Sequence, residues 1–376
     1  MSGKLLIGKV LLLLVMLLAL VGGPALLGCT GVNTIPRGWS GGVIADDTIF
    51  LGSMEGKLVA IDVSSQERRW PDVPFEASKK ATGFGCAPDA GGVAIYGSPS
   101  LTEELVYIAA YHGKLYAINS ETGALRWVYP REGELEPIVG GPVSVLGKVY
   151  IGSSDGKLYA LDAATGDKGW EFETGGKIWS TPSVNGDTVY IGSFDKKLYA
   201  LDTVDGRKKW EFATEGAIVA TPLVYDDTVY IGSFDRYLYA LSEADGSLRW
   251  KFQAENWFWG RPLADGGVIY TASVDGRVYA FNAGNGDKIA EFNLGSPVSS
   301  SPVLSEGSVM VASQAGRIYA VNSGQQKKQL VDLEEEIYAS LAASGGVVYV
   351  HTDKDVLYAV DTRSGAIRWS LSLESE

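Results

Sequence analysis

The feature that most constrains the fold is a short pattern that the chain repeats eight times. Each copy has an apolar strand, a turn and a second strand of the form Leu-Tyr-Ala-Leu-Asp, and the clearest copy runs from Val149 to Asp162. Most turns are about 40 residues apart, which is the period of a four-stranded propeller blade. They stand at Gly56, Gly113, Gly156, Lys196, Arg236, Gly276, Gly316 and Asp355.

Within each copy, apolar and polar residues alternate with a period of two, as in antiparallel strands. No stretch after residue 30 keeps the three-to-four-residue period of a helix, so a helical solenoid of the same repeat length is excluded. The pattern therefore predicts an all-β fold, an eight-bladed β-propeller of four-stranded antiparallel blades over residues 38–373. The first interval between turns is longer, and we assign the extra residues to an insertion over 71–101.

An alanine recurs in the third strand of every copy, and a tryptophan follows in the predicted outer strand of six copies. A position that admits only alanine is expected to lie against a large neighbour, and these tryptophans are the expected neighbours. Copies six and seven have Ala290 and Leu330 instead. The tryptophans are Trp70, Trp127, Trp170, Trp210, Trp250 and Trp369.

The run Ala160-x-Asp162-x-x-Thr165-Gly166-x-x-x-Trp170 resembles the tryptophan-docking motif of pyrroloquinoline-quinone (PQQ) repeat propellers. That group includes quinoprotein alcohol dehydrogenases and the outer-membrane assembly lipoproteins of the BamB type, to which the layout is most similar. The resemblance covers residues 38–373. It implies the fold directly, whereas function is implied only as an expectation, because unrelated activities share this structural motif.

The first residues are typical of an export signal. Lys4 and Lys9 precede an apolar run from Val10 to Leu20, and Leu26-Leu27-Gly28-Cys29 resembles a bacterial lipobox. We predict a signal peptide over 1–28, lipidation of Cys29 and a lipid-anchored linker over 29–37. The propeller would then be exported and face the periplasm or the exterior, on the outer membrane if the cell has one. The alternative is an uncleaved membrane anchor.

The net charge is −13, and no run of Lys and Arg stands out. Both observations argue against binding to nucleic acid or to anionic lipid headgroups. A monomeric propeller is expected, held to the membrane through its lipid alone.

The candidate binding site is a position three residues before the innermost strand's proline. In a propeller this position lies near the start of the strand that lines the central channel, so its side chains are expected to ring one mouth. Tryptophan and tyrosine offer a rigid surface with a polar group, which suits a ligand or a protein partner. The alternative interpretation is aromatic filling between blades. Across the copies the position holds Trp39, Tyr96, Val139, Trp179, Val219, Trp259, Ser299 and Tyr338.

Copy six adds Trp257, Phe258 and Arg261, and the Arg261 position holds only small residues in the other copies. A guanidinium beside three aromatic rings could bind a carboxylate or stack on a ring. The alternative is a simple ion pair with Glu255 or Asp265.

No catalytic residues, metal or cofactor are predicted. The resemblance implies that a quinoprotein dehydrogenase would have an adjacent cysteine pair, which the chain lacks, and Asp155, Asp195, Asp235 and Asp275 repeat at one turn position. His112 stands at a turn position and is expected at the surface, and His351 stands at a position that holds small residues in other copies. Neither has a second histidine nearby for a metal. The expected function is a non-catalytic scaffold for envelope or outer-membrane proteins. Alternatives are a glycan or cell-wall binder that stacks its ligand on Trp39, Trp179 and Trp259, or a PQQ-dependent dehydrogenase with a degenerate site.

Overall fold

The computed structural model describes residues 38–76 and 93–374. The predicted signal peptide, the lipidation site Cys29, the linker and the central part of the insertion lie outside these residues, so they stay predictions. Only residues of the unit Ile35–Glu376 are described below. Its described residues contain no helix long and apolar enough to cross a membrane.

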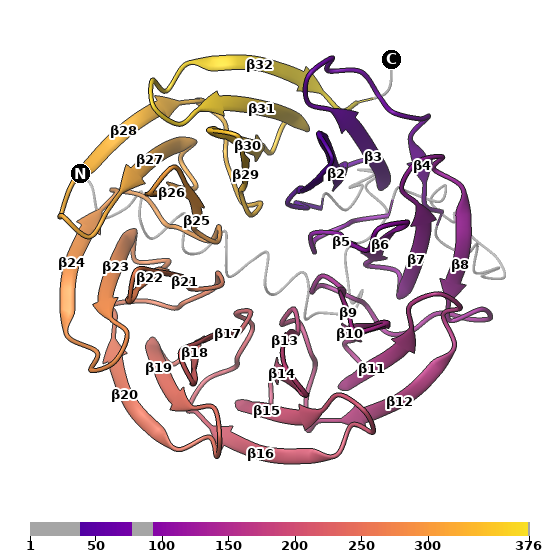
Figure 1. Cartoon of the computed structure of the whole chain (residues 1–376), viewed down its shortest axis with the longest axis horizontal. Coiled ribbons are helices and arrows are strands. Elements are labelled where there is room, and N and C mark those ends of the chain that lie inside the picture. Colours follow the sequence, from indigo (N-terminus) through magenta and orange to yellow (C-terminus); the bar gives the residue numbers. More distant parts are fainter. Residues whose placement is uncertain (1–37, 77–92, 375–376) are drawn as a thin grey trace, which may run out of the picture. The chain divides into compact units, whose positions relative to one another are not determined.

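The described chain folds into eight four-stranded antiparallel sheets arranged as blades around a ring, which confirms the predicted all-β propeller (Figure 1). Each blade uses four consecutive strands, and the first strand of each lies nearest the axis. No strand is exchanged between the two ends of the described chain.

The strands of blades 1 to 4 are β1 (Val43–Ala45), β2 (Thr48–Gly52), β3 (Lys57–Asp62), β4 (Val73–Pro74), β5 (Ser100–Leu101), β6 (Leu105–Ala110), β7 (Lys114–Asn119), β8 (Leu125–Tyr129), β9 (Val143–Val145), β10 (Lys148–Gly152), β11 (Lys157–Asp162), β12 (Lys168–Glu173), β13 (Ser183–Asn185), β14 (Thr188–Gly192), β15 (Lys197–Asp202) and β16 (Lys208–Ala213).

Those of blades 5 to 8 are β17 (Leu223–Tyr225), β18 (Thr228–Gly232), β19 (Tyr237–Ser242), β20 (Leu248–Gln253), β21 (Leu263–Asp265), β22 (Val268–Ala272), β23 (Arg277–Asn282), β24 (Lys288–Asn293), β25 (Val303–Ser305), β26 (Ser308–Ala312), β27 (Arg317–Val321), β28 (Lys327–Asp332), β29 (Ala342–Ser344), β30 (Val347–His351), β31 (Val356–Asp361) and β32 (Ile367–Ser372).

Two strands of regular blades, β4 and β5, lie inside the range 71–101 that we assigned to an insertion. Only the residues between them can therefore be additional to the repeat. The outer strand of blade 1 is short, since β4 pairs only with Lys57 and Leu58 of β3.

The turn between the second and third strands has a positive φ at all eight predicted positions, from Gly56 to Asp355. In four blades an aspartate before this residue fixes the turn. Asp155, for example, accepts hydrogen bonds from the Lys157 amide at 2.8 Å and from the Tyr159 hydroxyl at 2.6 Å. These contacts support the interpretation of the repeated aspartates as turn residues.

The outer-strand tryptophans join neighbouring blades. Trp127 lies opposite Ala117, as expected from the alanine rule, but its ring also reaches the next blade. Its indole N–H donates to the Ala163 carbonyl at 3.0 Å, and a Cβ added to Gly166 would lie 2.6 Å from the ring. Equivalent bonds run from Trp70, Trp170, Trp210 and Trp250 to Ser120, Thr203, Glu243 and Ala283. In these five interfaces the glycine turn, such as Thr165-Gly166, is thus the docking surface for the preceding blade's tryptophan.

Of the two exceptions expected in copies six and seven, the structure confirms the first and corrects the second. In blade 6, Ala290 does lie opposite Ala280. In blade 7, however, Lys328 lies opposite Ala320, and a register shift in β28 displaces Leu330 from that position.

Blades 8 and 1 close the ring through residues that the repeat does not share. His351 stands where other blades have glycine or alanine, and it is buried with its Nδ1 3.0 Å from the Ser40 carbonyl oxygen and its Nε2 2.7 Å from Asp355 Oδ1. Asp355 Oδ1 also accepts the Met54 amide at 3.0 Å. The expectation that His351 occupies a small-residue position is correct, and its size serves the closing contact.

Candidate functional site: the channel and its aromatic mouth

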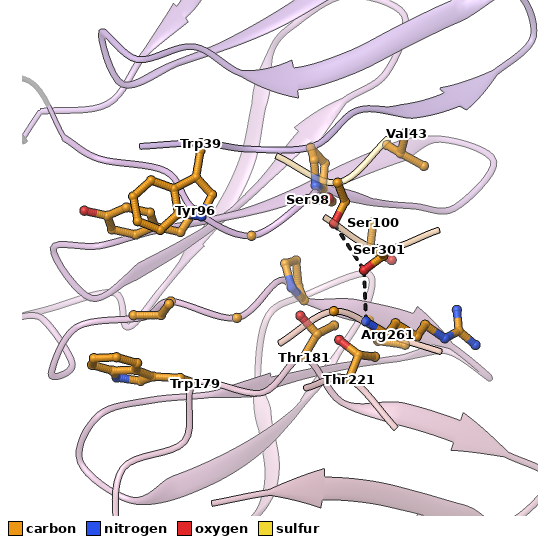
Figure 2. Close-up of a pocket in the computed structure, with 18 of the residues that line it drawn as sticks. Trp39, Val43, Tyr96, Ser98, Ser100, Trp179, Thr181, Thr221, Arg261 and Ser301 are labelled. Atoms are coloured by element: carbon orange, nitrogen blue, oxygen red, sulfur yellow. Dashed lines mark hydrogen bonds between the residues drawn. The ribbon is translucent and has the colours of Figure 1, made fainter. Parts of the chain in front are cut away.

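The central channel contains a cavity of about 600 Å³, to which all eight blades contribute residues. Six of the seven residues predicted for the mouth line this cavity directly: Trp39, Tyr96, Trp179, Trp259, Arg261 and Tyr338. They lie there because the chain of each blade passes the channel just before its first strand begins, and Figure 2 shows three of them grouped at one end.

The aromatic side chains form two separate groups. The first, which we call arc A, comprises Tyr338, Trp39, Tyr96 and Tyr111 from blades 8, 1 and 2. The Trp39 ring centroid lies 4.6 Å from that of Tyr96 and 5.7 Å from that of Tyr338, and Tyr96 lies 5.5 Å from Tyr111. Arc A therefore spans the closing interface of the ring.

The second group, arc B, comprises Trp179, Phe194, Phe234, Trp257 and Trp259 from blades 4 to 6. Phe194 lies 4.6 Å from Trp179 and 6.3 Å from Phe234, measured between ring centroids. Phe234 stacks on Trp257 at 4.7 Å and on Trp259 at 5.7 Å. Val139 and Ser299, from blades 3 and 7, separate the two arcs.

Most rings of the two arcs are half-buried, and Trp179 is the exception at 4% exposed. The Trp179 indole N–H donates to Ser154 Oγ at 3.0 Å, and the Tyr338 hydroxyl donates to Glu336 at 2.5 Å. Burial raises the pKa of Tyr96 to about 12, so this hydroxyl is neutral at physiological pH. The half-buried rings are rigid and still offer surface to a partner.

Acidic loops lie beside arc A. Glu336, which accepts the Tyr338 hydroxyl, belongs to the run Glu334-Glu335-Glu336 that leads into blade 8. The carboxylate of Glu134, in the loop before blade 3, is close enough to His112 to raise its pKa, but desolvation by burial has the larger effect and lowers it. This side of the mouth therefore favours groups that are cationic as well as apolar.

The Arg261 position, below the mouth, forms a belt of small hydroxyl side chains. Its members include Ser98, Thr181, Thr221, Ser301 and Ser340, and all line the cavity. The Arg261 amide donates to Ser301 Oγ at 3.0 Å, and its guanidinium extends away from Trp39, Tyr96 and Trp179 (Figure 2). Surrounding protein lowers the pKa of Arg261 by desolvation. Neither proposed ion-pair partner holds it, since Glu255 pairs with Arg277 and no ion pair joins Asp265 to Arg261 among the described residues.

Copy six does not place three aromatic rings around Arg261. Phe258 is fully buried and packs on Gly232, at the position that holds isoleucine in most other copies. Trp257 lies outside the cavity lining and joins the mouth through Phe234. The guanidinium and the aromatic face are thus separate features.

The prediction missed three aromatic residues of the mouth: Tyr111, Phe194 and Phe234. They occupy one repeat position, two residues before the positive-φ residue of the turn. Aligning the copies at this second position would have found them.

Among residues 38–76 and 93–374, no group of three or more His, Cys, Asp and Glu side chains could hold a metal ion. His112, expected at the surface, is partly buried with its Nε2 2.9 Å from the Tyr116 hydroxyl, and burial lowers its pKa. His351 belongs to the closing contact between blades 8 and 1. Neither histidine lies among the residues that line the channel cavity.

Two family models match the chain. One, described as "Beta-alanine-activating enzyme, beta-propeller", matches residues 149–376, and another, described as "Outer membrane protein assembly factor BamB", matches residues 30–177. No curated protein matches the chain.

Solved structures are similar over most of the chain. BamB from Moraxella catarrhalis is 20% identical with a TM-score of 0.67, and the match covers 90% of this chain and 95% of that one. The computationally designed Ika8 protein is 14% identical with a TM-score of 0.70, covering 88% and 95%. The quinohemoprotein alcohol dehydrogenase from Comamonas testosteroni is 15% identical with a TM-score of 0.66, covering 85% and 70%. At these identities the likeness shows the fold alone.

The repeat, the eight blades and these matches define a PQQ-like repeat β-propeller that resembles BamB. More specifically, the chain belongs to the propeller family described as that of the β-alanine-activating enzyme, whose model covers more than half of it. The matched proteins include one named as an assembly factor and one named as a dehydrogenase, so the fold itself assigns no activity.

Proposed function

We propose that the chain is a non-catalytic scaffold of the cell envelope that binds segments of other envelope or outer-membrane proteins on its aromatic mouth. The observation that carries this proposal is the gathering of half-buried aromatic rings, from blades 8, 1, 2, 4, 5 and 6, on one face of the propeller. Tryptophan and tyrosine are among the residues that contribute most to protein-protein binding, and such residues cluster on the binding surface.

The charge around the mouth indicates which kind of partner segment would bind there. Glu134 and Glu336 lie beside arc A, and the whole chain has a net charge of −13. A partner segment that combines aliphatic or aromatic side chains with Lys or Arg would be attracted to this face, and added salt would weaken its binding.

Two further points support the envelope setting. The match to a family described as outer membrane protein assembly factor BamB favours a role in the assembly of outer-membrane proteins. The signal-like residues 1–28 and the lipobox cysteine Cys29 agree with export and lipid anchoring. The propeller is proposed to face the periplasm or the exterior from a membrane surface.

Photocrosslinking in the native envelope tests the proposal. A photoreactive phenylalanine analogue replaces Trp257, which is half-buried on the aromatic face, and in a matched control it replaces Tyr225. Tyr225 is also half-buried, but it ends the innermost strand of blade 5, far from the turn that carries Phe234. We expect adducts with envelope proteins at Trp257 and fewer at Tyr225. Equal adducts at both positions would contradict the choice of face.

A second candidate, a glycan or cell-wall ligand, is favoured by one observation. The channel combines rings suited to stacking, Trp39 and Trp259, with the hydroxyl belt of Ser98, Thr181 and Thr221. Titration with cell-wall oligosaccharides should then change the tryptophan fluorescence, and Trp259→Ala should abolish the change. A flat titration that accompanies clear protein adducts at Trp257 would leave the scaffold as the function.

A further inference from the structure

The interface between blades 7 and 8 differs from the tryptophan-docked interfaces, and the regular ones show what normally fills it. In three of them a tyrosine of the second strand and the outer-strand tryptophan donate to one carbonyl of the next blade's turn. Tyr107 and Trp127 reach the Ala163 oxygen at 2.9 and 3.0 Å, and their rings lie 5.7 Å apart. The pairs Tyr150 with Trp170 and Tyr230 with Trp250 reach Thr203 and Ala283 in the same way.

Blade 7 lacks both donors. Met310 replaces the tyrosine, and Lys328 lies opposite Ala320 where the tryptophan would stand. A cavity of about 310 Å³ results, lined by Met310 and Ala320 from blade 7 and by Thr362 from the turn of blade 8. This volume is at the lower end of the range for ligand sites. The cavity therefore occupies part of the place that other blades fill with their own aromatic pair; the Leu330 backbone covers Gly365, the glycine of the docking turn.

The backbone of the turn remains as in the docked interfaces. Thr362 is the counterpart of Ala163, Thr203 and Ala283, and among the described residues no donor reaches its carbonyl oxygen. Lys328 is exposed and donates instead to the next carbonyl, that of Arg363, at 2.6 Å. Thr362 is 6% exposed, and covering its carbonyl without supplying a donor would be costly, so the site favours a ligand that brings one.

Blade 6 lacks the tryptophan but keeps the tyrosine, so its interface with blade 7 differs from that between blades 7 and 8. There Tyr270 is retained opposite Ala280, and the Gln325 side chain of blade 7 reaches back to the Ile289 carbonyl at 3.1 Å. Blade 7 differs from it in having lost both rings.

We propose that the cavity between blades 7 and 8 is a binding site for an indole ring, supplied by a tryptophan side chain of a partner polypeptide. The ring would lie on Met310 and Ala320, and its N–H would donate to the Thr362 carbonyl, as the chain's own tryptophans do at the equivalent turns. Ser308 and Asn322 line the cavity and can bond the partner's backbone. The exposed Lys328 side chain can leave without disturbing a buried contact.

Methyl NMR of the full chain in detergent tests this site, because the chain has only four methionines. The Met310 methyl reports on the cavity, and Met54, at the repeat position of Phe194 and Phe234, reports on the aromatic mouth. N-acetyl-tryptophanamide should shift the Met310 signal with a dissociation constant of about 1 mM. N-acetyl-phenylalaninamide, which lacks the ring N–H, should bind about fivefold more weakly.

Filling the cavity from within provides the matched control. Lys328→Trp restores the residue that the other blades have and should abolish the Met310 response. Lys327→Trp changes the neighbouring exposed residue and should leave the response intact. Melting temperatures show that both variants are folded, and Lys328→Trp should melt no lower than Lys327→Trp.

Three results would overturn the proposal: no Met310 shift in the unaltered chain, a shift that persists in Lys328→Trp, or equal binding of the two amides. Tighter binding of free indole than of N-acetyl-tryptophanamide would overturn the assignment to a polypeptide side chain. The proposal does not depend on the aromatic mouth, since a shift at Met54 alone would support mouth binding and contradict this site.

Discussion

The regular blade interfaces and the closing interface solve the same packing problem with different residues. Between regular blades, a small residue at the end of the second strand receives a large apolar one from the next blade, as Gly152 receives Ile178 and Gly192 receives Ile218. At the closure the sizes are reversed, because blade 8 has His351 and blade 1 has Gly38 at these positions. A tryptophan also faces glycine at the regular turns, whereas Trp369 of blade 8 faces the turn that carries Gln66.

The difference shows what repetition can and cannot specify. A repeated interface is self-complementary, so any blade could pack on any other, and the chain could in principle close with the wrong number of blades. The pair His351–Asp355 bonds the Ser40 carbonyl and the Met54 amide of blade 1, a contact that no other described blade interface has. Unique buried polar contacts of this kind favour one register over its alternatives. Four predictions, from the largest expected effect to the smallest, test this contrast.

Removing a docking tryptophan should lower the free energy of unfolding more at a regular interface than at the closing interface. Trp170 is 9% exposed and bonds the Thr203 carbonyl, so Trp170→Ala is expected to lower the free energy of unfolding by about 3–5 kcal/mol. Trp369 is half-buried and donates no hydrogen bond to a described residue, so Trp369→Ala should cost about 1–2 kcal/mol less. Equilibrium urea unfolding measures both, and equal losses would mean that the closure depends on its tryptophan as much as the other interfaces do.

The turn facing the tryptophan should respond in the same direction. Gly166 has a φ of +73°, and an added Cβ would lie 2.6 Å from the Trp127 ring, so Gly166→Ala should cost about 2–4 kcal/mol through backbone strain and overpacking. Gln66 already has a side chain at a φ of +65°, and Gln66→Ala should change stability by less than about 0.5 kcal/mol. Thermal unfolding of the two variants makes the comparison. A large loss for Gln66→Ala would show that its side chain takes part in the closure.

Arc A adds contacts between aromatic side chains across the closing interface. Ionisation of Tyr96 should make the stability of the fold depend on pH. Burial, with a smaller effect from Tyr111, raises its pKa from 10 to about 12. Between these values the folded chain keeps a proton that the unfolded chain loses, so stability falls as the pH rises, by up to about 3 kcal/mol. Tyr96→Phe should remove that part of the loss between pH 10 and 12. An unchanged slope would mean that this hydroxyl ionises without disturbing the arc.

Much of the fold was predictable because the repeat shows it directly. The eight turns, the strand pairs and the alanine-tryptophan pairing follow from comparing residues within each copy. The docking of each tryptophan on the next blade was not found, because it joins different copies. The sequence does contain a signal for this docking. Copy six has Ala290 in place of the tryptophan, and the next copy has Gln325 where most docking turns have glycine, so the two residues are lost together.

The mouth was predicted only in part, for a similar reason. Comparing one repeat position identified Trp39 and Trp179, but Phe194 and Phe234 belong to a second position whose side chains meet the first only in space. Phe258 was misassigned because its aromatic character hides its equivalence to the buried isoleucines of other copies. His351 and Asp355 replace residues that the other copies have at their positions. Comparing copies marks both as different but cannot reveal their contact, which joins blades 8 and 1.

The smallest expected effect concerns this contact. His351→Gln keeps a polar side chain of similar length. A glutamine amide, however, cannot bond both Ser40 and Asp355 with the geometry of the imidazole. We expect a loss of about 1–2 kcal/mol, the cost of one weakened buried hydrogen bond. His112→Gln is the control, since His112 bonds Tyr116 within its own blade. Amide exchange locates the effect: the Met54 amide, which Asp355 accepts, should exchange faster in His351→Gln, while the Phe194 amide, held by the Lys177 carbonyl at 2.9 Å, should not change. Faster exchange at both amides would mean that the ring opens as one unit, and the closing interface would then have no stability of its own.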